Sequence, residues 1–379
     1  MSPAGPGSIV DQFIGPVSLH QIEAHLRPAV LPFVVAAVLA ALLTPLAIVA
    51  SRRLGVLAVP GGRRIHLRPT PLLGGAVLYV AFAASMFWYF PHGRQLAGLL
   101  IVGGLGAALF VIDDVRGMPA PAKLGIEAGL AVLAVLAFPG YLIGFLTLPH
   151  AGIVQIGLIA YPLTLAWLLG MQNTVNLLDG VDGLATGVVA IVAVTLLIAA
   201  ASKGPVDVVV ATGALAGACG GFLLFNFHPA RIFMGDSGSH FLGLTLGLLS
   251  ILGVAKVAVV FALAVPALAL AVPIVDTGWA VIRRRRQGLS IAHPDTRHIH
   301  HQLLDFGLSQ PETCLLFYCS TAILGAFGLM LFGHKRILAV AIVLLVVAVA
   351  TVVGERLQGA GWRVPAPGLR ALLGEERPS

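Results

Sequence analysis

Apolar runs of about 20 residues recur along the whole chain, and they constrain its fold more than any other feature. An α-helix needs about 20 predominantly apolar residues to cross the hydrocarbon core of a bilayer. Such runs lie at 30–50, 71–90, 96–112, 125–140, 153–170, 185–202, 207–225, 239–255, 257–282, 312–333 and 337–353. The sequence therefore predicts an all-α, polytopic integral membrane protein with about 11 transmembrane helices (10–11).

The composition excludes a large soluble domain. Charged residues make up only 10% of the 379 residues, too few to cover a soluble protein of this size. The three cysteines lie scattered in apolar runs, which favours neither disulfides nor a zinc site, and the first residues lack the pattern of a cleaved signal peptide. We expect a single transmembrane domain at 30–353, between an extracytoplasmic segment at 1–29 and a cytoplasmic tail at 354–379.

The distribution of Lys and Arg predicts the orientation. Counted on alternate sides of 11 spans, 17 of them fall on the side of the C-terminus and 6 on the side of the N-terminus. Because cationic residues are retained in the cytoplasm, the N-terminus is expected outside and the C-terminus inside. The net charge of +7 then reflects topology, and nucleic acid is not an expected partner because no basic soluble face with interleaved aromatics is present.

Four polar clusters fall on the predicted cytoplasmic side. They are "DDVRG" at 113–117, "NTVNLLDGVDG" at 173–183, "NFHPARIFMGDSGS" at 226–239 and "HPDTRHIHH" at 293–301. They belong to predicted cytoplasmic loops at 51–70, 113–124, 171–184, 226–238 and 283–311. The outer connections carry no comparable set of carboxylates, so one polar site at the inner membrane surface is expected.

The first cluster places Asp113 next to Asp114 at the end of an apolar run. One interpretation is a solvated helix end. The other is chemical: adjacent carboxylates repel, so that one keeps its proton or a divalent cation neutralises both. Mg²⁺ prefers oxygen ligands of this kind. The pair alone does not decide between the two interpretations.

The second cluster repeats a polar residue at every third position, as Asn173, Asn176, Asp179 and Asp182. At 3.6 residues per turn, this spacing spreads the four side chains over about half of a straight helix rather than along one face. Gly180 and Gly183 favour a loosened helix end that a ligand can approach closely. Hydrogen bonds to frayed backbone would explain the asparagines but not the two aspartates.

The third and fourth clusters also allow two interpretations each. Asp236 precedes an apolar run, so it can serve as a helix N-cap, or lie beside a phosphate bound at that helix N-terminus. Asn226 and Phe233 could hydrogen-bond to and stack on a base. The three histidines of "HIHH" could bind a transition metal, although no closed set of four ligands accompanies them, or could contact phosphate beside Arg297.

Taken together and in order, these clusters resemble the polyprenyl-phosphate N-acetylhexosamine-1-phosphate transferases of the glycosyltransferase 4 family. These membrane enzymes move a sugar 1-phosphate from a UDP-sugar to a lipid phosphate and release UMP. The resemblance runs from about residue 50 to 305 and rests on "RRIHLRPTPLLGG", "DD" with Lys123, "NTVNLLDGVDGLA", "NFHPARIFMGDSGS" and "HIHH". The form "HIHHQL" is similar to the branch that uses UDP-GlcNAc. The UDP-MurNAc-pentapeptide branch has three consecutive histidines followed by Phe-Glu.

Two departures from the family pattern concern sugar specificity more than reaction class. Relatives often have an Asp before the Pro where this chain has "LAVPGG". They also tend to have a basic residue directly after the loop Asp, whereas here Thr296 separates Asp295 from Arg297.

The resemblance implies that GlcNAc 1-phosphate is transferred from UDP-GlcNAc to undecaprenyl (polyprenyl) phosphate at the bacterial plasma membrane. This would be the first membrane step of a cell-envelope polysaccharide. Direct displacement and a two-step route through a phosphosugar on an Asp both stay open, as do another UDP-N-acetylhexosamine, UDP-MurNAc-pentapeptide and a homodimer. A secondary transporter is a distant alternative, since its site would be expected near the membrane midplane.

The resemblance also implies roles for individual residues. Those implied to be catalytic are Asp113, Asp114, His300 and His301. Mg²⁺, or alternatively Mn²⁺, is implied on Asp236 and Asp114. Substrate contacts are implied for Arg68, Lys123, Asn173, Asn176, Asp179, Asp182, Asn226, Phe233, Arg297 and His298. Among these, Asp179 and Phe233 are implied nearest the uracil, and Lys123 is implied to meet a phosphate. Which Asp acts as the base stays open.

Overall fold

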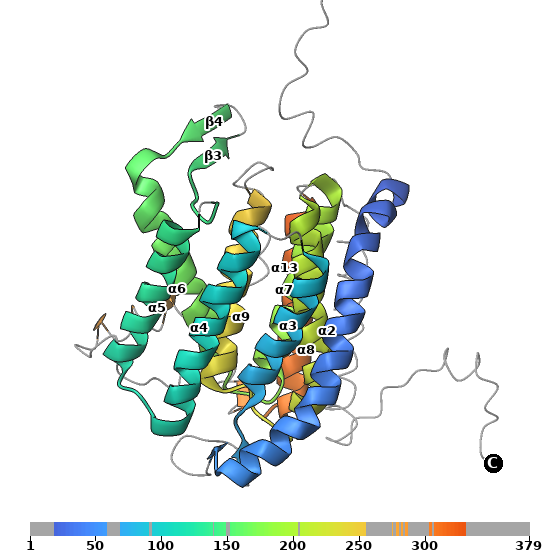
Figure 1. The fold of residues 1–379 in the computed structure, drawn as a ribbon, viewed down its shortest axis with the longest axis vertical. Coiled ribbons are helices and arrows are strands. Elements are labelled where there is room, and N and C mark those ends of the chain that lie inside the picture. Colours follow the sequence, from blue (N-terminus) through green and yellow to red (C-terminus); the bar gives the residue numbers. More distant parts are fainter. Residues whose placement is uncertain are drawn as a thin grey trace, which may run out of the picture.

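The protein is mostly helical where its structure, a computed structural model, describes it. The described residues are 19–58, 69–90, 93–138, 140–148, 152–203, 205–254, 275, 278–279, 282, 285–286, 303–304 and 307–330. The helices are α2 (Leu19–Leu54), α3 (Gly74–Tyr89), α4 (Arg94–Arg116), α5 (Ala120–Ala137), α6 (Ala160–Leu178), α7 (Leu184–Lys203), α8 (Val206–Asn226), α9 (Gly235–Val254) and α13 (Gln310–Met330), with a short 3-10 helix η1 (Gly157–Ile159). They run side by side along one direction as a bundle (Figure 1).

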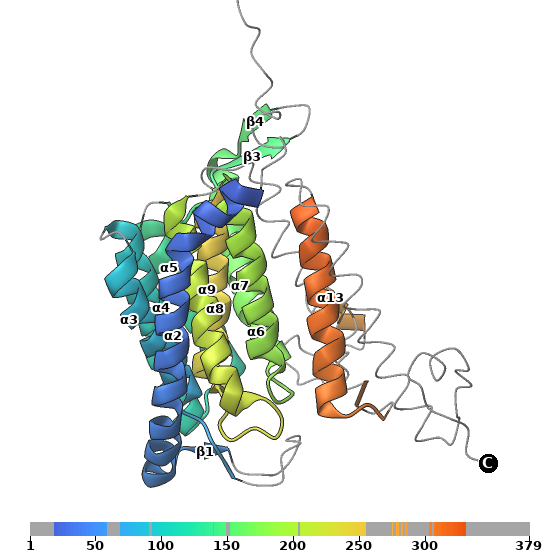
Figure 2. The same ribbon diagram turned by 90° about the vertical axis from the view of Figure 1, so that its right-hand side faces the viewer.

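Two short antiparallel ribbons mark the two ends of this bundle. β1 (Leu57–Ala58) pairs with β2 (Thr70–Pro71), with Leu57 opposite Pro71. β3 (Phe145–Leu148) pairs with β4 (Gly152–Gln155), with Phe145 opposite Gln155. The β3–β4 hairpin projects from one end of the bundle, and β1 lies at the other (Figure 2). We refer to the latter as the β1–β2 end.

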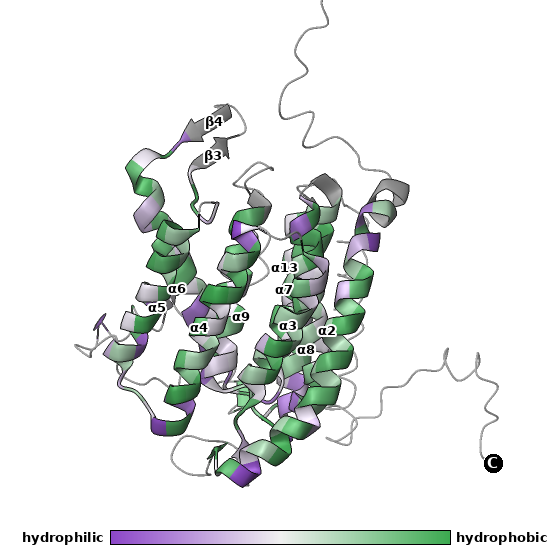
Figure 3. Cartoon of the chain, viewed as in Figure 1, coloured by the Kyte–Doolittle hydropathy of each residue, from purple (hydrophilic) through white to green (hydrophobic). Residues whose placement is uncertain are grey.

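The surface of the bundle is that expected of a multi-pass membrane protein. Within the described residues, six helical segments are long and apolar enough to cross a bilayer: Ala24–Leu54, Arg94–Arg116, Ala120–Ala137, Leu184–Ala201, Val206–Asn226 and Gln310–Leu329. Hydrophobic residues cover the middle of the helices, and many of the hydrophilic ones lie near helix ends (Figure 3). A helix satisfies its own backbone hydrogen bonds, which is what a segment inside lipid requires.

Helix α9 is the centre of the bundle. Every residue from Ser237 to Leu252 is buried, and α9 contacts α3, α4, α6, α7 and α8. Phe241 of α9 packs edge-on against Tyr79 and Phe82 of α3, with ring centroids 5.6 and 5.8 Å apart. Because α9 begins at the β1–β2 end, its first turn is placed among the ends of the neighbouring helices.

Close backbone contact ties α2 to α8. A Cβ atom added to Gly217 of α8 would lie 2.1 Å from the carbonyl oxygen of Phe33 in α2. Small residues at a helix interface allow this approach, which is a common source of association energy between helices in membranes. The α2–α8 contact therefore holds the chain leading to β1 against the bundle.

The helix boundaries differ from the predicted ones in two ways. The predicted span at 153–170 is wrong at its start, because β4 occupies Gly152–Gln155 and α6 begins only at Ala160. In addition, α4, α6 and α9 extend into the polar clusters and α5 begins within the predicted loop at 113–124, so the loops are shorter than predicted. The polar side chains in these terminal turns form hydrogen bonds and ion pairs with one another. Each helix therefore extends beyond its apolar run. The predicted spans at 257–282 and 337–353 lie mainly or wholly outside the described residues.

Candidate active site

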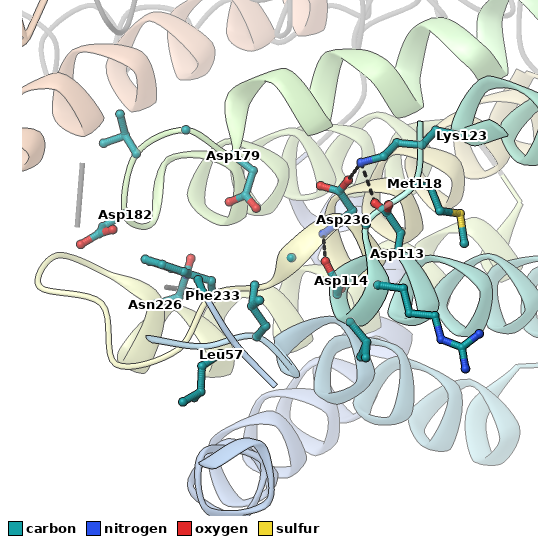
Figure 4. Close-up of a pocket in the computed structure, with 18 of the residues that line it drawn as sticks. Leu57, Asp113, Asp114, Met118, Lys123, Asp179, Asp182, Asn226, Phe233 and Asp236 are labelled. Carbon is teal, nitrogen blue, oxygen red and sulfur yellow. Dashed lines mark hydrogen bonds and ion pairs between the residues drawn. The ribbon is translucent and has the colours of Figure 1, made fainter. Parts of the chain in front are cut away.

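A cavity of about 630 Å³ lies at the β1–β2 end of the bundle. Its lining comes from β1, the end of α4, the start of α5, the α6–α7 turn, the α8–α9 loop and the start of α13. The lining residues are Leu57, Ala58, Leu72, Asp113, Asp114, Val115, Arg116, Gly117, Met118, Lys123, Asp179, Gly180, Val181, Asp182, Asn226, Phe233, Gly235, Asp236 and Gln310. Three of the four predicted polar clusters thus meet at one cavity (Figure 4).

Lys123 bridges two carboxylates from different helices. Its ammonium group, in the first turn of α5, lies 2.6 Å from Asp113 Oδ2 in the last turn of α4. It also forms an ion pair and hydrogen bond with Asp236 Oδ2 in the first turn of α9. Gly117 and Pro119 separate α4 from α5, and this tight connection brings Lys123 back over Asp113. One cation on α5 therefore pairs with one acid on α4 and another on α9 (Figure 4).

Asp113 carries an unpaired oxygen in this arrangement. The residue is only 5% exposed, and among the described residues its Oδ1 has no hydrogen-bond partner. A buried carboxylate oxygen without a partner carries a large desolvation cost. Asp113 Oδ1 can therefore accept a hydrogen bond from a bound group or contact a cation.

Asp114 caps the central helix from a distance. Its Oδ1 accepts a hydrogen bond of 2.7 Å from the backbone N–H of Asp236, and its Oδ2 accepts one of 3.2 Å from that of Ser237. The capping role that the sequence allowed for Asp236 therefore belongs to Asp114 on α4. A carboxylate at a helix N-terminus is also favoured by the helix dipole, so the α4–α9 junction is fixed by charge as well as by packing.

Gly235 makes this cap possible. Its φ is +68°, and a Cβ atom there would lie 2.5 Å from Asp114 Oδ2. Only glycine adopts such a conformation readily and leaves the space free. The glycine in "MGDSG" therefore lets the carboxylate of one helix reach the first backbone N–H groups of another.

The two asparagines of the second cluster serve as braces inside α6. Asn176 Nδ2 donates to Asp236 Oδ1 and to Ser239 Oγ, both at 3.0 Å. Asn173, one turn earlier, donates to Glu127 Oε2 of α5 at 2.5 Å. Neither side chain belongs to the cavity lining. In this structure they orient the charged groups of α5 and α9.

The two aspartates of that cluster lie on the turn between α6 and α7. Asp179 ends α6 and lines the cavity. Burial raises the pKa of its carboxyl group well above the usual range, and the charges of Asp236, Asp114 and Asp182 raise it further. A bound group that donates hydrogen bonds or carries positive charge would favour the ionised form of this carboxyl.

Asp182 braces the α8–α9 loop. Its Oδ2 accepts hydrogen bonds of 3.0 Å from His228 Nδ1 and from the backbone N–H of Ala230. Its own backbone N–H donates to Gln310 Oε1 of α13 at 3.3 Å. This aspartate therefore links three segments around the cavity, and it lies further from Lys123 than Asp179 does (Figure 4).

Asn226 and Phe233 frame the far side of the cavity. Asn226 is buried, accepts from Thr186 Oγ1 at 2.7 Å and donates to the carbonyl oxygen of Ile232 at 3.0 Å, so its amide braces the loop. The backbone N–H of Phe233 donates to Pro71 of β2 at 2.8 Å, and its carbonyl accepts from the N–H of Gly74 at 3.1 Å. These two bonds fix the Phe233 backbone at the cavity wall.

Two residues absent from the sequence-based prediction adjoin this cluster. Glu127 of α5 and His240 of α9 are each 2% exposed, and Glu127 Oε1 lies 3.7 Å from His240 Nδ1. Their sequence signal is spacing: each follows a site residue, Lys123 or Asp236, by four positions and lies one helical turn deeper.

The five remaining predicted site residues lie outside the described residues. They are Arg68, Arg297, His298, His300 and His301. Their roles stay predictions.

A divalent cation fits the donor set in one respect. Within the described ranges, no three His, Cys, Asp or Glu side chains form a ready-made metal site. Mg²⁺, however, is usually bound by one or two carboxylates together with waters and substrate phosphates. Asp113 has an unpaired oxygen, whereas both oxygens of Asp236 and both of Asp114 accept hydrogen bonds. Each of these oxygens keeps a further lone pair, so the carboxylates present fit Mg²⁺ as one or two ligands beside waters and substrate phosphates.

Comparison with known proteins gives consistent matches. The model of the family "Glycosyl transferase family 4" matches residues 96–254, which include α4 to α9. A protein of Bacillus subtilis named as a probable undecaprenyl-phosphate N-acetylglucosaminyl 1-phosphate transferase is 32% identical over 336 residues, which is 88% of this chain and 93% of that protein.

Two further relatives are named for different transferase activities. The decaprenyl-phosphate N-acetylglucosaminephosphotransferase of Mycolicibacterium smegmatis is 36% identical over 309 residues, 73% of this chain and 75% of that protein. A phospho-N-acetylmuramoyl-pentapeptide-transferase of Moorella thermoacetica is 34% identical over 245 residues, 59% of this chain and 75% of that protein. With identity above 30% over nearly the whole of the Bacillus relative, this chain belongs to glycosyl transferase family 4.

Proposed function

We propose that this protein transfers GlcNAc 1-phosphate from UDP-GlcNAc to undecaprenyl phosphate or another polyprenyl phosphate and releases UMP. This would be the first membrane step of a cell-envelope polysaccharide. The observation that carries the proposal is the convergence of Lys123, Asp113 and Asp236 from three helices beside one cavity, in a chain of this family. A transporter is disfavoured, because this cluster lies at helix ends rather than halfway along them.

GlcNAc is the sugar we propose first, because the form "HIHHQL" of the histidine motif is similar to the branch that uses UDP-GlcNAc. The Bacillus relative, whose name includes N-acetylglucosaminyl 1-phosphate, also matches 88% of this chain. Another UDP-N-acetylhexosamine and UDP-MurNAc-pentapeptide are the alternatives.

The proposed reaction is one displacement at phosphorus. An oxygen of the lipid phosphate attacks the β-phosphorus of UDP-GlcNAc, the bond from that phosphorus to the bridging oxygen breaks, and UMP leaves with that oxygen. Such a reaction depends chiefly on positioning and on charge stabilisation. A site at a helix-bundle end suits it, because one substrate is water-soluble and the other is anchored in lipid.

Lys123 and Asp113 are the residues we propose for the acceptor side. The ammonium group has three N–H donors, of which two face Asp113 and Asp236, so one is left to hold a phosphate oxygen. The unpaired Asp113 Oδ1 would receive the proton of the lipid phosphate as it attacks. Asp114, proposed to act in catalysis and at the metal ion, would also hold the first turn of α9 and with it Asp236.

Mg²⁺ is the proposed cofactor, with Mn²⁺ as the alternative. Asp236 and Asp114 would hold it together with the diphosphate. When bound, the ion would neutralise diphosphate charge and stabilise the leaving UMP.

The uridine end of the donor is proposed to lie along the α6–α7 turn and the α8–α9 loop. Asp179 would accept a hydrogen bond from the N3–H group of the uracil, and the Phe233 ring would stack on the base. Asp182 and Asn226 would hold the walls of this part of the cavity through their bonds to the α8–α9 loop. The predicted contacts of Arg68, Arg297 and His298 with substrate, and the catalytic roles of His300 and His301, complete the proposal.

The topology we propose has 11 spans with the N-terminus outside, the C-terminus inside and the cavity open to the cytoplasm of a bacterial cell. The excess of Lys and Arg on one side supports it. Accessibility of single cysteines introduced near Gly117 and near Leu158 to a membrane-impermeant thiol reagent would test it. Labelling near Gly117 in intact cells would contradict this orientation.

The decisive experiment uses the full-length protein in detergent with undecaprenyl phosphate, Mg²⁺ and a panel of UDP-sugars. We expect UMP release with UDP-GlcNAc and formation of a lipid-linked GlcNAc diphosphate. Lack of UMP release with every UDP-sugar would refute the proposal. Trapping of radiolabelled phosphosugar on an Asp of the protein would instead favour the two-step route.

A further inference from the structure

A second layer of side chains, three of them polar, lies one helical turn further from the β1–β2 end than the Lys123 cluster. The upper layer contains Asp113 of α4, Lys123 of α5, Asn176 of α6 and Asp236 of α9. The lower layer contains Phe110, Glu127, Asn173 and His240 of the same four helices. Each lower residue is three or four positions from its upper counterpart, which places it about 5–6 Å further from the β1–β2 end on the same helix face.

Contacts join the lower layer in the same way as the upper one. Glu127 Oε2 accepts from Asn173 Nδ2 at 2.5 Å, and Glu127 Oε1 lies 3.7 Å from His240 Nδ1. The imidazole of His240 stacks on Phe110 with ring centroids 3.8 Å apart and an interplanar angle of 16°. In the upper layer Lys123 of α5 contacts Asp236 of α9. In the lower layer Glu127 of α5 contacts Asn173 of α6 and His240 of α9.

The lower pair is costly as a source of stability alone. Glu127 and His240 are each 2% exposed, and among the described residues neither His240 ring nitrogen has a hydrogen-bond partner. Buried polar or ionic pairs are commonly no more stabilising than apolar residues of similar size. Leu and Phe would fill these two positions at lower cost, so a role other than stability accounts for the pair better.

We propose that Glu127 and His240 are positioning residues, which fix the register of α5 against α9 and thereby hold Lys123 and Asp236 in their reactive geometry. This inference rests on the proposed function of the cluster. The connection is direct, because Lys123 and Glu127 share one face of α5, and Asp236 and His240 share one face of α9. A slip of either helix would move both layers together.

The pair is tested best by replacing both members with apolar residues. In the double variant Glu127→Leu/His240→Phe the Phe ring can still stack on Phe110, and Asn173 can still donate to the carbonyl of Leu169. We expect the double variant to unfold no more easily than wild type, but to show a kcat lower by about 10- to 100-fold, as for residues that orient catalytic groups. The KM for UDP-GlcNAc should change by less than about 3-fold.

Two single variants serve as controls. Glu127→Gln keeps an oxygen that accepts from Asn173, so its kcat should stay within about 3-fold of wild type. Thr245→Val lies deeper in α9, is fully buried, and removes a hydroxyl that has no partner among the described residues. Its kcat should equal that of wild type.

The results separate this inference from the proposed function. If wild type releases no UMP with any UDP-sugar, the proposed function fails and the inference with it. If wild type is active and the double variant folds with wild-type kcat, only the positioning role is overturned. Should the double variant not purify as a folded protein, His240→Phe alone decides: a kcat near that of wild type overturns the role, and a fall of about 10-fold or more supports it.

Discussion

Replacing Gly235 with alanine tests the α4–α9 junction, because this residue has two independent reasons to be glycine. Its φ of +68° disfavours any side chain, and a Cβ atom would lie 2.5 and 2.6 Å from the two oxygens of Asp114. Gly117 offers a matched control. Its φ is +70°, but nothing lies within 4 Å of an added Cβ atom. The two substitutions thus share a positive φ and differ in the displacement of Asp114.

The expected cost follows from these contacts. Backbone with such a positive φ costs an L-residue about 1–3 kcal/mol, and this is the whole cost expected for Gly117→Ala. Displacing Asp114 also breaks its two hydrogen bonds to α9, each contributing about 1.5–3 kcal/mol for a charged acceptor. Because Asp114 is half-buried, water can replace part of the two hydrogen bonds. We therefore take the lower end of their summed contribution, about 3 kcal/mol. Gly235→Ala should therefore lower the free energy of unfolding by about 4–6 kcal/mol.

Unfolding in mixed detergent and SDS micelles, followed by circular dichroism, measures this difference. The same preparations should show UMP release reduced by about 100-fold or more for Gly235→Ala, since movement of about 1 Å at a catalytic group has effects of that size. Equal stability of the two variants, together with full UMP release by Gly235→Ala, would refute the role of Asp114 as the cap of α9.

Three further predictions concern the charged groups of the cavity. Lys123→Ala should lower UMP release by about 100-fold or more, because Asp113 and Asp236 then repel without a shared cation, and Lys123→Arg should recover part of it. Removal of divalent cations with EDTA should abolish UMP release, and added Mg²⁺ should restore it. The raised pKa of Asp179 means that its carboxyl holds a proton more tightly in the folded state than in the unfolded one. Stability is therefore lost as pH rises above the ordinary carboxyl pKa toward the raised one. Asp179→Asn should stabilise the fold at neutral pH, with a gain that disappears at acidic pH, and should raise the KM for UDP-GlcNAc.

Each of these predictions has a clear contrary result. Wild-type UMP release by Lys123→Ala would remove this lysine from the reaction. Full activity in EDTA would exclude a divalent cofactor. A stability gain for Asp179→Asn that persists at acidic pH would show that its origin is packing and not the carboxyl charge. The chelation and Lys123 experiments use UMP release, and the Asp179 experiment adds melting curves between acidic and neutral pH.

The sequence by itself determined the class of fold and the residue types of the site. Runs of about 20 apolar residues predict helices in lipid regardless of how the helices pack, and this part of the prediction agrees with the six candidate spans. The polar clusters around Asp113, Asp179 and Asp236 are also local signals. Their order along the chain was enough to predict that they serve one site, and all three residues line the same cavity.

Only the tertiary structure decided which of these residues bond to each other and which face the cavity. Asp114 caps α9 although 122 positions separate it from Asp236, and Asn173 and Asn176 brace neighbouring helices. The spacing of four places Glu127 and His240 on the helix faces of Lys123 and Asp236, but only the structure shows that the two side chains lie next to each other. The physical reason is that helix register is set by packing between helices, which depends on small residues and side-chain shapes far apart in the chain. An apolar run specifies that a helix forms, but not which turn of it meets which turn of the next.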